Sequence, residues 1–165
     1  MIISVCNDDQ DVDRIGRHSA RHDSATFGAF YPVGRTPPQL GAAENLFIIG
    51  HGAHRNAGDG ANPVIGNRGR GITLNGVELV EHLLGLPNGL TGGVNVFPNG
   101  YTGNLYVYAC ETADFADGAL SLAEVVTNTL QSALNNDSVA FGQSGSVDCS
   151  WLPGPNDHSW RSGFL

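Results

Sequence analysis

Short apolar segments alternate along this chain with long stretches rich in glycine and polar residues. Each segment is apolar without interruption, which is typical of parallel strands whose two faces are both covered. The pattern predicts buried strands, and Ala25–Phe30 is a candidate for one more. The four clear strands are Ile2–Cys6, Leu46–Gly50, Leu105–Ala109 and Val139–Gly142.

Two further segments have the pattern of amphipathic helices that begin with a capping box. Asn75 is followed three residues later by Glu78, and Ser121 is followed in the same way by Glu124. Each such pair can satisfy two backbone N–H groups at the start of a helix. The apolar stripes that would face the sheet are Val77, Val80, Leu83 and Leu84 in the first helix, and Leu122, Val125, Val126, Leu130 and Ala133 in the second.

The order of strands and helices predicts an α/β fold with right-handed crossovers. We expect one doubly wound domain over residues 1–165, with the tail 151–165 as either a docked arm or a partly disordered end. The polar segment Asp8–Ala43 has no helical pattern clear enough to assign. Three segments are predicted as glycine-rich loops of functional or disordered character: Ala53–Gly71, Pro87–Asn104 and Gln143–Leu165.

Composition narrows the class of protein. A length of 165 residues with 41% hydrophobic content suits one domain with a core, and a net charge of −8 argues against nucleic acid as a partner. The sparse cysteines Cys6, Cys110 and Cys149 form no C-x-x-C pair, so we expect reduced thiols. With no secretory signal and no apolar run long enough to span a bilayer, we expect a cytoplasmic protein without a membrane partner.

Chemistry-bearing residues follow two of the predicted strands. His51 stands between Gly50 and Gly52, and Cys110 follows Ala109. Parallel strands lie about 4.8 Å apart, so an imidazole and a thiol at neighbouring carboxyl ends can face each other. A histidine can activate a cysteine nucleophile, and backbone N–H groups can hold the developing oxyanion. Because no Asp or Asn is placed by the sequence to orient His51, the prediction is a His–Cys dyad.

The motifs "IIGHG" and "YACETA" resemble the histidine and cysteine motifs of the caspase-like superfamily of cysteine peptidases, most closely its CHAT-like members. That superfamily also includes caspases, gingipains, clostripain, separase and the cysteine protease domains of RTX-type toxins. The segment "GITLNGVELVEHLLGL" is similar to the piece that joins the two motifs in the toxin domains. The resemblance is clearest over residues 45–147. The helix that follows the first strand in the family is not evident in Asp8–Ala43.

The resemblance implies a caspase-like α/β/α sandwich with a mostly parallel central sheet. It implies that His51 is the catalytic histidine, that Gly52 and Cys110 donate N–H groups to the oxyanion, and that Cys110 forms a thioester acyl-enzyme. The substrate would be a protein or peptide, and no cofactor would be required. The family's loop after the next strand lines the substrate groove, which here places Gln143, Ser144 and Gly145 among the substrate-binding residues.

Acidic residues near the same edge suggest a specificity pocket for Arg or Lys, with Asp8 as a substrate-binding candidate. Long loops beside the site would permit a latent or autoprocessing form. The acidic residues that would surround the edge are Asp8, Asp9, Asp114, Asp117 and Asp148.

Two alternatives remain open on the sequence. The first is a catalytically silent domain of the same fold that binds or scaffolds other proteins. The second is a metal-dependent hydrolase that uses His51, His54 and Asp59, although spacing of this kind is a weak sign of a metal site. Ser144 follows a strand in a Gly-x-Ser context, but no helix pattern follows it, so it is not predicted as a nucleophile.

Overall fold

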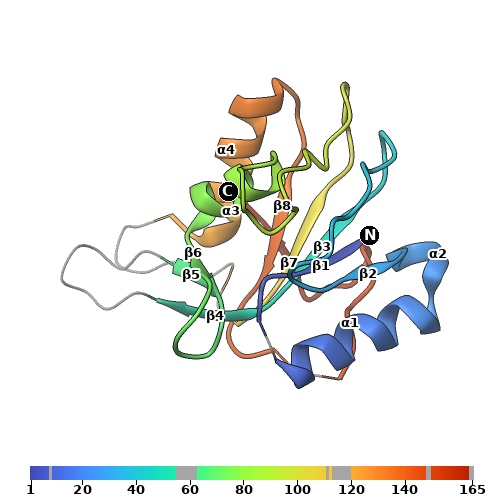
Figure 1. Ribbon diagram of the computed structural model, residues 1–165, viewed down its shortest axis with the longest axis vertical. Helices are drawn as coiled ribbons and strands as arrows, with labels where there is room; N and C mark the ends of the chain where they lie inside the picture. The colour runs from blue at the N-terminus through green and yellow to red at the C-terminus, as the bar shows by residue number, and fades with distance from the viewer. Residues whose placement is uncertain (8, 55–62, 111, 113–119, 148–149, 164–165) are drawn as a thin grey trace.

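A computed structural model describes residues 1–7, 9–54, 63–110, 112, 120–147 and 150–163 (Figure 1). Its centre is a six-stranded sheet in the order β2-β1-β3-β7-β8-β9. The first five strands are parallel, and β9 is antiparallel to β8. The strands are β1 (Ile2–Ser4), β2 (Phe30–Tyr31), β3 (Leu46–Ile49), β7 (Leu105–Tyr108), β8 (Ala140–Gln143) and β9 (Trp160–Ser162).

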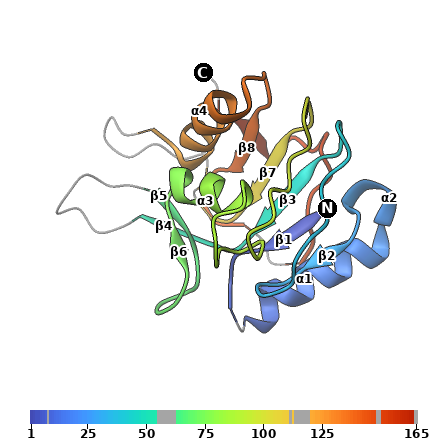
Figure 2. The ribbon, with the colours of Figure 1, turned by 45° about the horizontal axis from the view of Figure 1, so that its top comes forward.

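Helices lie on both faces of this sheet. Figures 1 and 2 show α3 (Gly76–Leu83) and α4 (Leu122–Leu134) together on one face, and α1 (Gln10–His22) and α2 (Ser24–Phe27) on the other. Each face has its own cluster of buried apolar side chains. The α/β class, the mostly parallel sheet and the four clear strands predicted from the sequence are therefore confirmed.

The segment Ala25–Phe30 is not a strand, and the prediction for it was wrong. Its first part belongs to the short helix α2, and only its last residue enters β2. Asp23 caps α2 by accepting a hydrogen bond from the Thr26 N–H at 3.0 Å. The helix ends at Gly28, which has a φ of 63°, so most of this segment is used before the strand begins.

Helix α1 lies in the segment Asp8–Ala43, for which the pattern of residues predicts no clear helix. Its buried stripe has helical spacing, but only Val12 and Ile15 are large and apolar, whereas the next two positions are Gly16 and Ser19. A Cβ at Gly16 would overlap the ring of Phe30, so the small residue lets α1 approach the sheet closely. The helix that the family resemblance requires after the first strand is thus present.

Both predicted capping boxes are formed. In α3 the side chains of Asn75 and Glu78 exchange hydrogen bonds with each other's backbone N–H, and Ser121 and Glu124 do the same in α4. The predicted stripes need correction at their edges. Val77 is 43% exposed because α3 turns Leu79, Val80 and Leu83 toward the core instead, and Ala133 of α4 is exposed while Val125 is half-buried.

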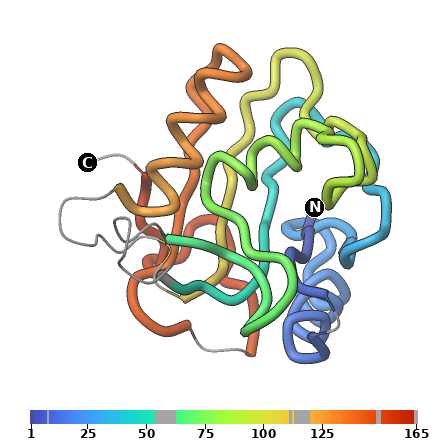
Figure 3. Tube along the Cα trace, turned by 60° about the vertical axis from the view of Figure 1, so that its left-hand side comes forward, coloured from blue at the N-terminus to red at the C-terminus, as the bar shows by residue number. Residues whose placement is uncertain are grey.

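A second, three-stranded antiparallel sheet takes up part of the segment Ala53–Gly71, which was expected to be loop, and extends beyond both of its ends. It consists of β4 (His51–His54), β5 (Pro63–Gly66) and β6 (Thr73–Leu74) in that order. The tube in Figure 3 follows the chain from the end of β3 directly into β4. Gly50 is the single residue between them, and a Cβ there would lie 2.6 Å from a methyl group of Val5. Glycine at this position therefore allows the chain to pass from β3 in the first sheet to β4 in the second.

The last part of the chain is packed against the α1 face. Leu152 and Trp160 are buried in the apolar cluster of that face, and the Leu152 N–H donates to Ser19 Oγ at 3.1 Å. Among the described helices, none is long and apolar enough to cross a membrane.

Candidate active site

The predicted histidine and cysteine follow adjacent strands. Strands β3 and β7 pair in parallel, with Ile49 opposite Tyr108, and the Gly50 N–H donates to the Tyr108 carbonyl at 3.3 Å. His51 and Cys110 each come two residues after this last pair. The prediction that the two segments end at the same edge of the sheet is confirmed.

Gly52 brings the two segments into backbone contact. An ideal Cβ on Gly52 would lie 2.9 Å from the nitrogen of Cys110 and closer still to its carbonyl group. No side chain fits in that space without displacing the Cys110 backbone. Glycine at this position therefore allows the strand that carries the histidine to lie directly against the residue that carries the thiol.

His51 has an acidic partner that the sequence analysis did not assign. The imidazole Nε2 of His51 and the Oδ2 of Asp9 are 2.7 Å apart, and both side chains are mostly buried, with 20% and 24% exposed. A carboxylate at this distance accepts a hydrogen bond from the Nε2–H group and orients the ring. The expectation that no acidic residue orients His51 was wrong, because β1 neighbours β3 and brings Asp9 alongside. The catalytic dyad itself stays a prediction.

The start of α1 holds the Asp9 carboxylate in place. Asp9 is the N-cap of that helix, and its Oδ1 accepts hydrogen bonds from the N–H groups of Asp11 and Val12, each at 3.1 Å. Burial opposes ionisation of Asp9, but its hydrogen bond with His51 and those from the helix N–H groups outweigh burial and lower the pKa of the carboxyl group. One oxygen is therefore fixed by the helix while the other binds the imidazole.

Hydrogen bonds tie the β1–α1 connection to the second sheet. Asn67 accepts from the Asn7 N–H at 3.2 Å and donates to the Asn7 carbonyl at 2.9 Å, and its Oδ1 also accepts from the Ile72 N–H. The Cys6 thiol donates to the Gly66 carbonyl at 2.8 Å. Because Asp9 follows this connection and His51 pairs with Gly66, the contacts hold the acid and the imidazole together.

Cys6 lies beside the site but is not suited to act as a nucleophile. Burial is the main cause that raises the pKa of its thiol to about 11; a backbone hydrogen bond at His51 opposes the rise, and the nearby carboxylates of Asp9 and Asp13 add to it. The side chain is buried and the sulfur is hydrogen bonded. A thiol with this pKa stays protonated at neutral pH and is therefore a poor nucleophile.

Thr112 anchors the turn that presents Cys110. Its buried hydroxyl lies 3.1 Å from the carbonyl oxygens of both Val107 and Ala109, and it accepts a hydrogen bond from the Gln143 N–H at 2.8 Å. One hydroxyl thus connects the end of β7 to the end of β8. The sequence analysis quoted this threonine within a motif but gave it no role.

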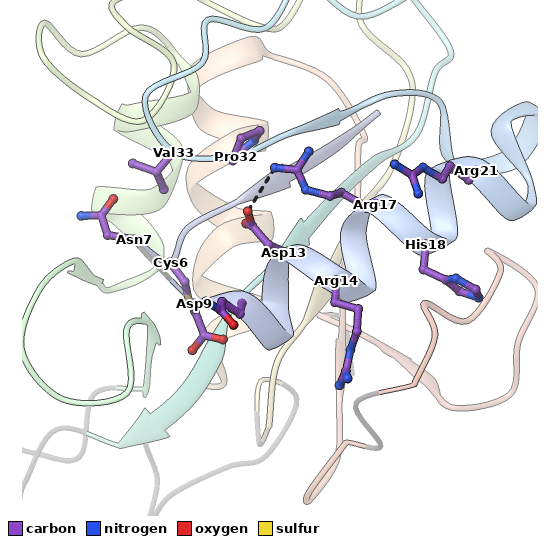
Figure 4. Close-up of a pocket in the computed structure, with 11 residues that line it drawn as sticks. Cys6, Asn7, Asp9, Asp13, Arg14, Arg17, His18, Arg21, Pro32 and Val33 are labelled. Atoms are coloured by element: carbon purple, nitrogen blue, oxygen red, sulfur yellow. Dashed lines mark hydrogen bonds and ion pairs between the residues drawn. The ribbon is translucent and has the colours of Figure 1, made fainter.

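His51 and Cys110 share a cavity of about 200 Å³ beneath the edge of the sheet. Asp9 does not line this cavity; it lines a larger one of about 640 Å³ along α1 (Figure 4). In that view the Asp13 carboxylate accepts from Arg17 at 3.3 Å. His51 therefore shares the smaller cavity with Cys110, while its carboxylate partner lines the larger one.

The residues predicted to bind substrate are only partly placed. Gln143 is buried and its side chain donates to Ser159 Oγ at 3.3 Å, and both Gln143 and Ser144 line a cavity of about 530 Å³ next to that of His51 and Cys110. Gly145 has a φ of 65°, which favours glycine. The predictions that lie outside the described residues concern Asp8, Asp59, Asp114, Asp117, Asp148, Cys149 and the side chain of His54.

The described residues do not form the predicted acidic pocket or the predicted metal site. Of the five acids expected around the edge, only Asp9 is described, and its oxygens are engaged by His51 and the helix. Within the described part of the chain, no three His, Cys, Asp or Glu side chains are grouped so that they could hold a metal ion.

Comparison of the chain with protein-family models, with curated proteins and with solved structures finds no match. The function must therefore be argued from the chemistry of the residues themselves.

Proposed function

We propose that this protein is a cysteine endopeptidase in which Asp9, His51 and Cys110 form the catalytic group. The observation that carries the proposal is that Cys110 shares a cavity with an imidazole whose Nε2 lies 2.7 Å from a carboxylate oxygen. Histidines of this kind serve as general bases for thiol and hydroxyl nucleophiles. The contact between Gly52 and the Cys110 backbone keeps the two segments in register.

In this proposal the two nitrogens of His51 have different tasks. Asp9 occupies Nε2, so Nδ1 is the nitrogen that exchanges protons with the reacting groups. Nδ1 takes the proton from the Cys110 thiol, and the sulfur attacks the carbonyl carbon of the scissile bond. The carbonyl oxygen becomes an oxyanion, which the N–H groups of Gly52 and Cys110 stabilise.

Collapse of this intermediate breaks the carbon–nitrogen bond and leaves a thioester on Cys110. His51 returns its proton to the departing amine, which would otherwise leave as an unstable anion. A water molecule then gives a proton to His51 and attacks the thioester. The acid is released, and the sulfur recovers the proton. Throughout the cycle the Asp9 carboxylate stabilises the imidazolium form of His51.

The fold supports the narrower proposal of a caspase-like peptidase. A mostly parallel sheet lies between two layers of helices, and the histidine and cysteine follow neighbouring strands. Helix α1, which the resemblance required after the first strand, is present and supplies the cap that holds Asp9. These features are what the resemblance in the two short motifs implies for the whole domain.

The test is hydrolysis of an unfolded protein substrate by the wild type and by the Cys110→Ala and Cys110→Ser variants. We expect cleavage by the wild type and none by either variant, with unchanged unfolding curves for all three. Cleavage that survives both substitutions would refute the proposal. If that residual activity is lost when a chelator is added, the result would support the metal-dependent alternative instead. A folded wild type that cleaves nothing, and whose Cys110 is unreactive, would favour the silent scaffold.

A further inference from the structure

The cavity that His51 and Cys110 share has mostly apolar walls. Val12 and Ile15 of α1, Ile49 at the end of β3 and Tyr108 at the end of β7 are all at least nine-tenths buried in the protein. Val147, from the segment after β8, packs against the same apolar cluster. The cavity is therefore an opening in the hydrophobic core of the α1 face, and a side chain placed in it would continue that core.

The position of the cavity relates it directly to the reacting bond. Cys110 itself forms part of the wall, so the carbonyl carbon that its sulfur attacks must lie at the mouth of the cavity. In a peptide, the Cα that bears the side chain is bonded to that carbonyl carbon. The side chain nearest to the cavity is thus that of the residue that becomes the acyl group.

The charged residues on the described part of the wall offer no buried partner to a charged substrate side chain. Besides His51, the charged residues there are Asp11 and Arg68. The Asp11 carboxylate is 3.0 Å from Arg14 in a pair of which both members are about 70% exposed. Arg68 is exposed as well. A charged substrate group that entered between the apolar walls would lose its hydration without a buried partner, and that loss is costly.

The volume sets the size of the occupant. Closed apolar cavities of about 150 Å³ are known to hold a benzene molecule, and this cavity measures about 200 Å³. A side chain between leucine and phenylalanine in size would fill it and displace the water. We propose that this cavity is the primary specificity pocket and that the enzyme cleaves after large apolar residues. This inference rests on the proposed function and replaces the basic-residue pocket suggested by the acids in the sequence.

The test is a series of acetyl-Ala-Ala-X chloromethyl ketones with X as Leu, Phe, Arg or Glu. The Cys110 thiolate displaces chloride from each reagent and forms a thioether, so mass spectrometry reports every rate at the same sulfur. Burial of a large apolar side chain favours Leu and Phe over Arg and Glu by about 10-fold or more. Equal rates for Leu and Arg, or a preference for Arg or Glu, would overturn the inference.

Substitutions in the wall sharpen the test. Val147→Asp places a carboxylate at a half-buried position of the cavity, so we expect the Leu-to-Arg rate ratio to fall about 10-fold. Val77→Asp makes the same change in charge on the exposed side of α3, and the ratio should stay at its wild-type value. If the two variants behave alike, Val147 does not line the pocket that receives the probe.

A failure of the inference can be told apart from a failure of the proposed function. The small reagent iodoacetamide carries no side chain for the cavity, so its rate at Cys110 reports only the activated thiol. Rapid alkylation that depends on His51, together with no preference among the ketones, would overturn the pocket and keep the peptidase. Slow alkylation by iodoacetamide and by all four ketones would overturn both.

Discussion

Replacing Asp9 with asparagine separates the two tasks of this side chain. As an N-cap, asparagine is about as good as aspartate, so its oxygen can still accept from the Asp11 and Val12 N–H groups. The amide nitrogen then stands where Oδ2 faced His51. It donates to Nε2 and holds the ring proton on Nδ1, which is the nitrogen required to accept the proton of the thiol. The variant should fold normally and react slowly.

The magnitude follows from the geometry of the pair. A hydrogen bond to a charged group contributes about 1.5–3 kcal/mol. Because the side chains of His51 and Asp9 are 20% and 24% exposed, water screens their interaction in part, and we expect a contribution toward the lower end of this range. Since about 1.4 kcal/mol is a factor of ten in rate, kcat/KM should fall about 10- to 30-fold from the lost charge alone. The reversed ring tautomer makes the fall larger. The unfolding free energy should fall by less than it does in Asp9→Ala, because asparagine keeps the helix cap.

The assay is kcat/KM on a peptide substrate together with urea unfolding of each variant. Asp9→Ala should lose activity and also about 1 kcal/mol of stability, because it removes the cap as well. Asp23→Asn is the matched control, since Asp23 also caps a helix and lies outside the site. Wild-type kinetics in Asp9→Asn would refute the role given to the carboxylate. Equal losses in Asp9→Asn and Asp23→Asn would reduce that role to folding alone.

Three further predictions test the contacts around the site. Gly52→Ala pushes the Cys110 backbone away, so kcat/KM should fall about 100-fold, whereas Gly154→Ala, which meets no neighbour, should leave it unchanged. Thr112→Val removes the hydroxyl that accepts a hydrogen bond from the buried Gln143 N–H and leaves that N–H without a partner. The unfolding free energy measured in urea should fall by about 1–3 kcal/mol, whereas Thr112→Ser keeps the hydroxyl and should keep the wild-type stability. The lowered pKa of Asp9 means that its ionised form stabilises the fold at every pH above about 4 and loses this effect as the pH falls through the lowered value. The stability gap between wild type and Asp9→Ala should therefore be constant from pH 5 upward and shrink toward pH 3, and a gap that grows in acid would contradict this.

The strands and the two capped helices could be predicted because their signals are local. A continuous apolar run such as Leu46–Ile49 has few alternatives to a buried strand, and a box such as Ser121 with Glu124 marks a helix start directly. Helix α1 could not be predicted because Gly16 and Ser19 occupy half of its buried stripe, which leaves too few large apolar residues to mark a helical pattern. Those residues are small because the helix packs closely on the sheet, which is a tertiary demand that no local pattern reveals.

In the site, too, the features that depend on local sequence could be predicted, whereas the one that depends on tertiary contacts could not. The glycines around His51 and the apolar strand before Cys110 are local features, and they identified both residues. Asp9 became the partner of His51 only because β1 lies next to β3, and strand order is not visible in a sequence without a structure. Asp9 was considered as a wall of a pocket, and its position before a helix was a signal that could have indicated a cap.

The most direct test of the account is the rate at which iodoacetamide alkylates each cysteine at pH 6, with mass spectrometry to locate the label. Most thiols are protonated at this pH. The account predicts fast labelling of Cys110, slow labelling of Cys6, whose pKa is raised to about 11, and loss of the difference in His51→Ala. If Cys110 in the wild type reacts no faster than Cys6, or reacts as fast without His51, the histidine does not activate the thiol and the central claim is wrong.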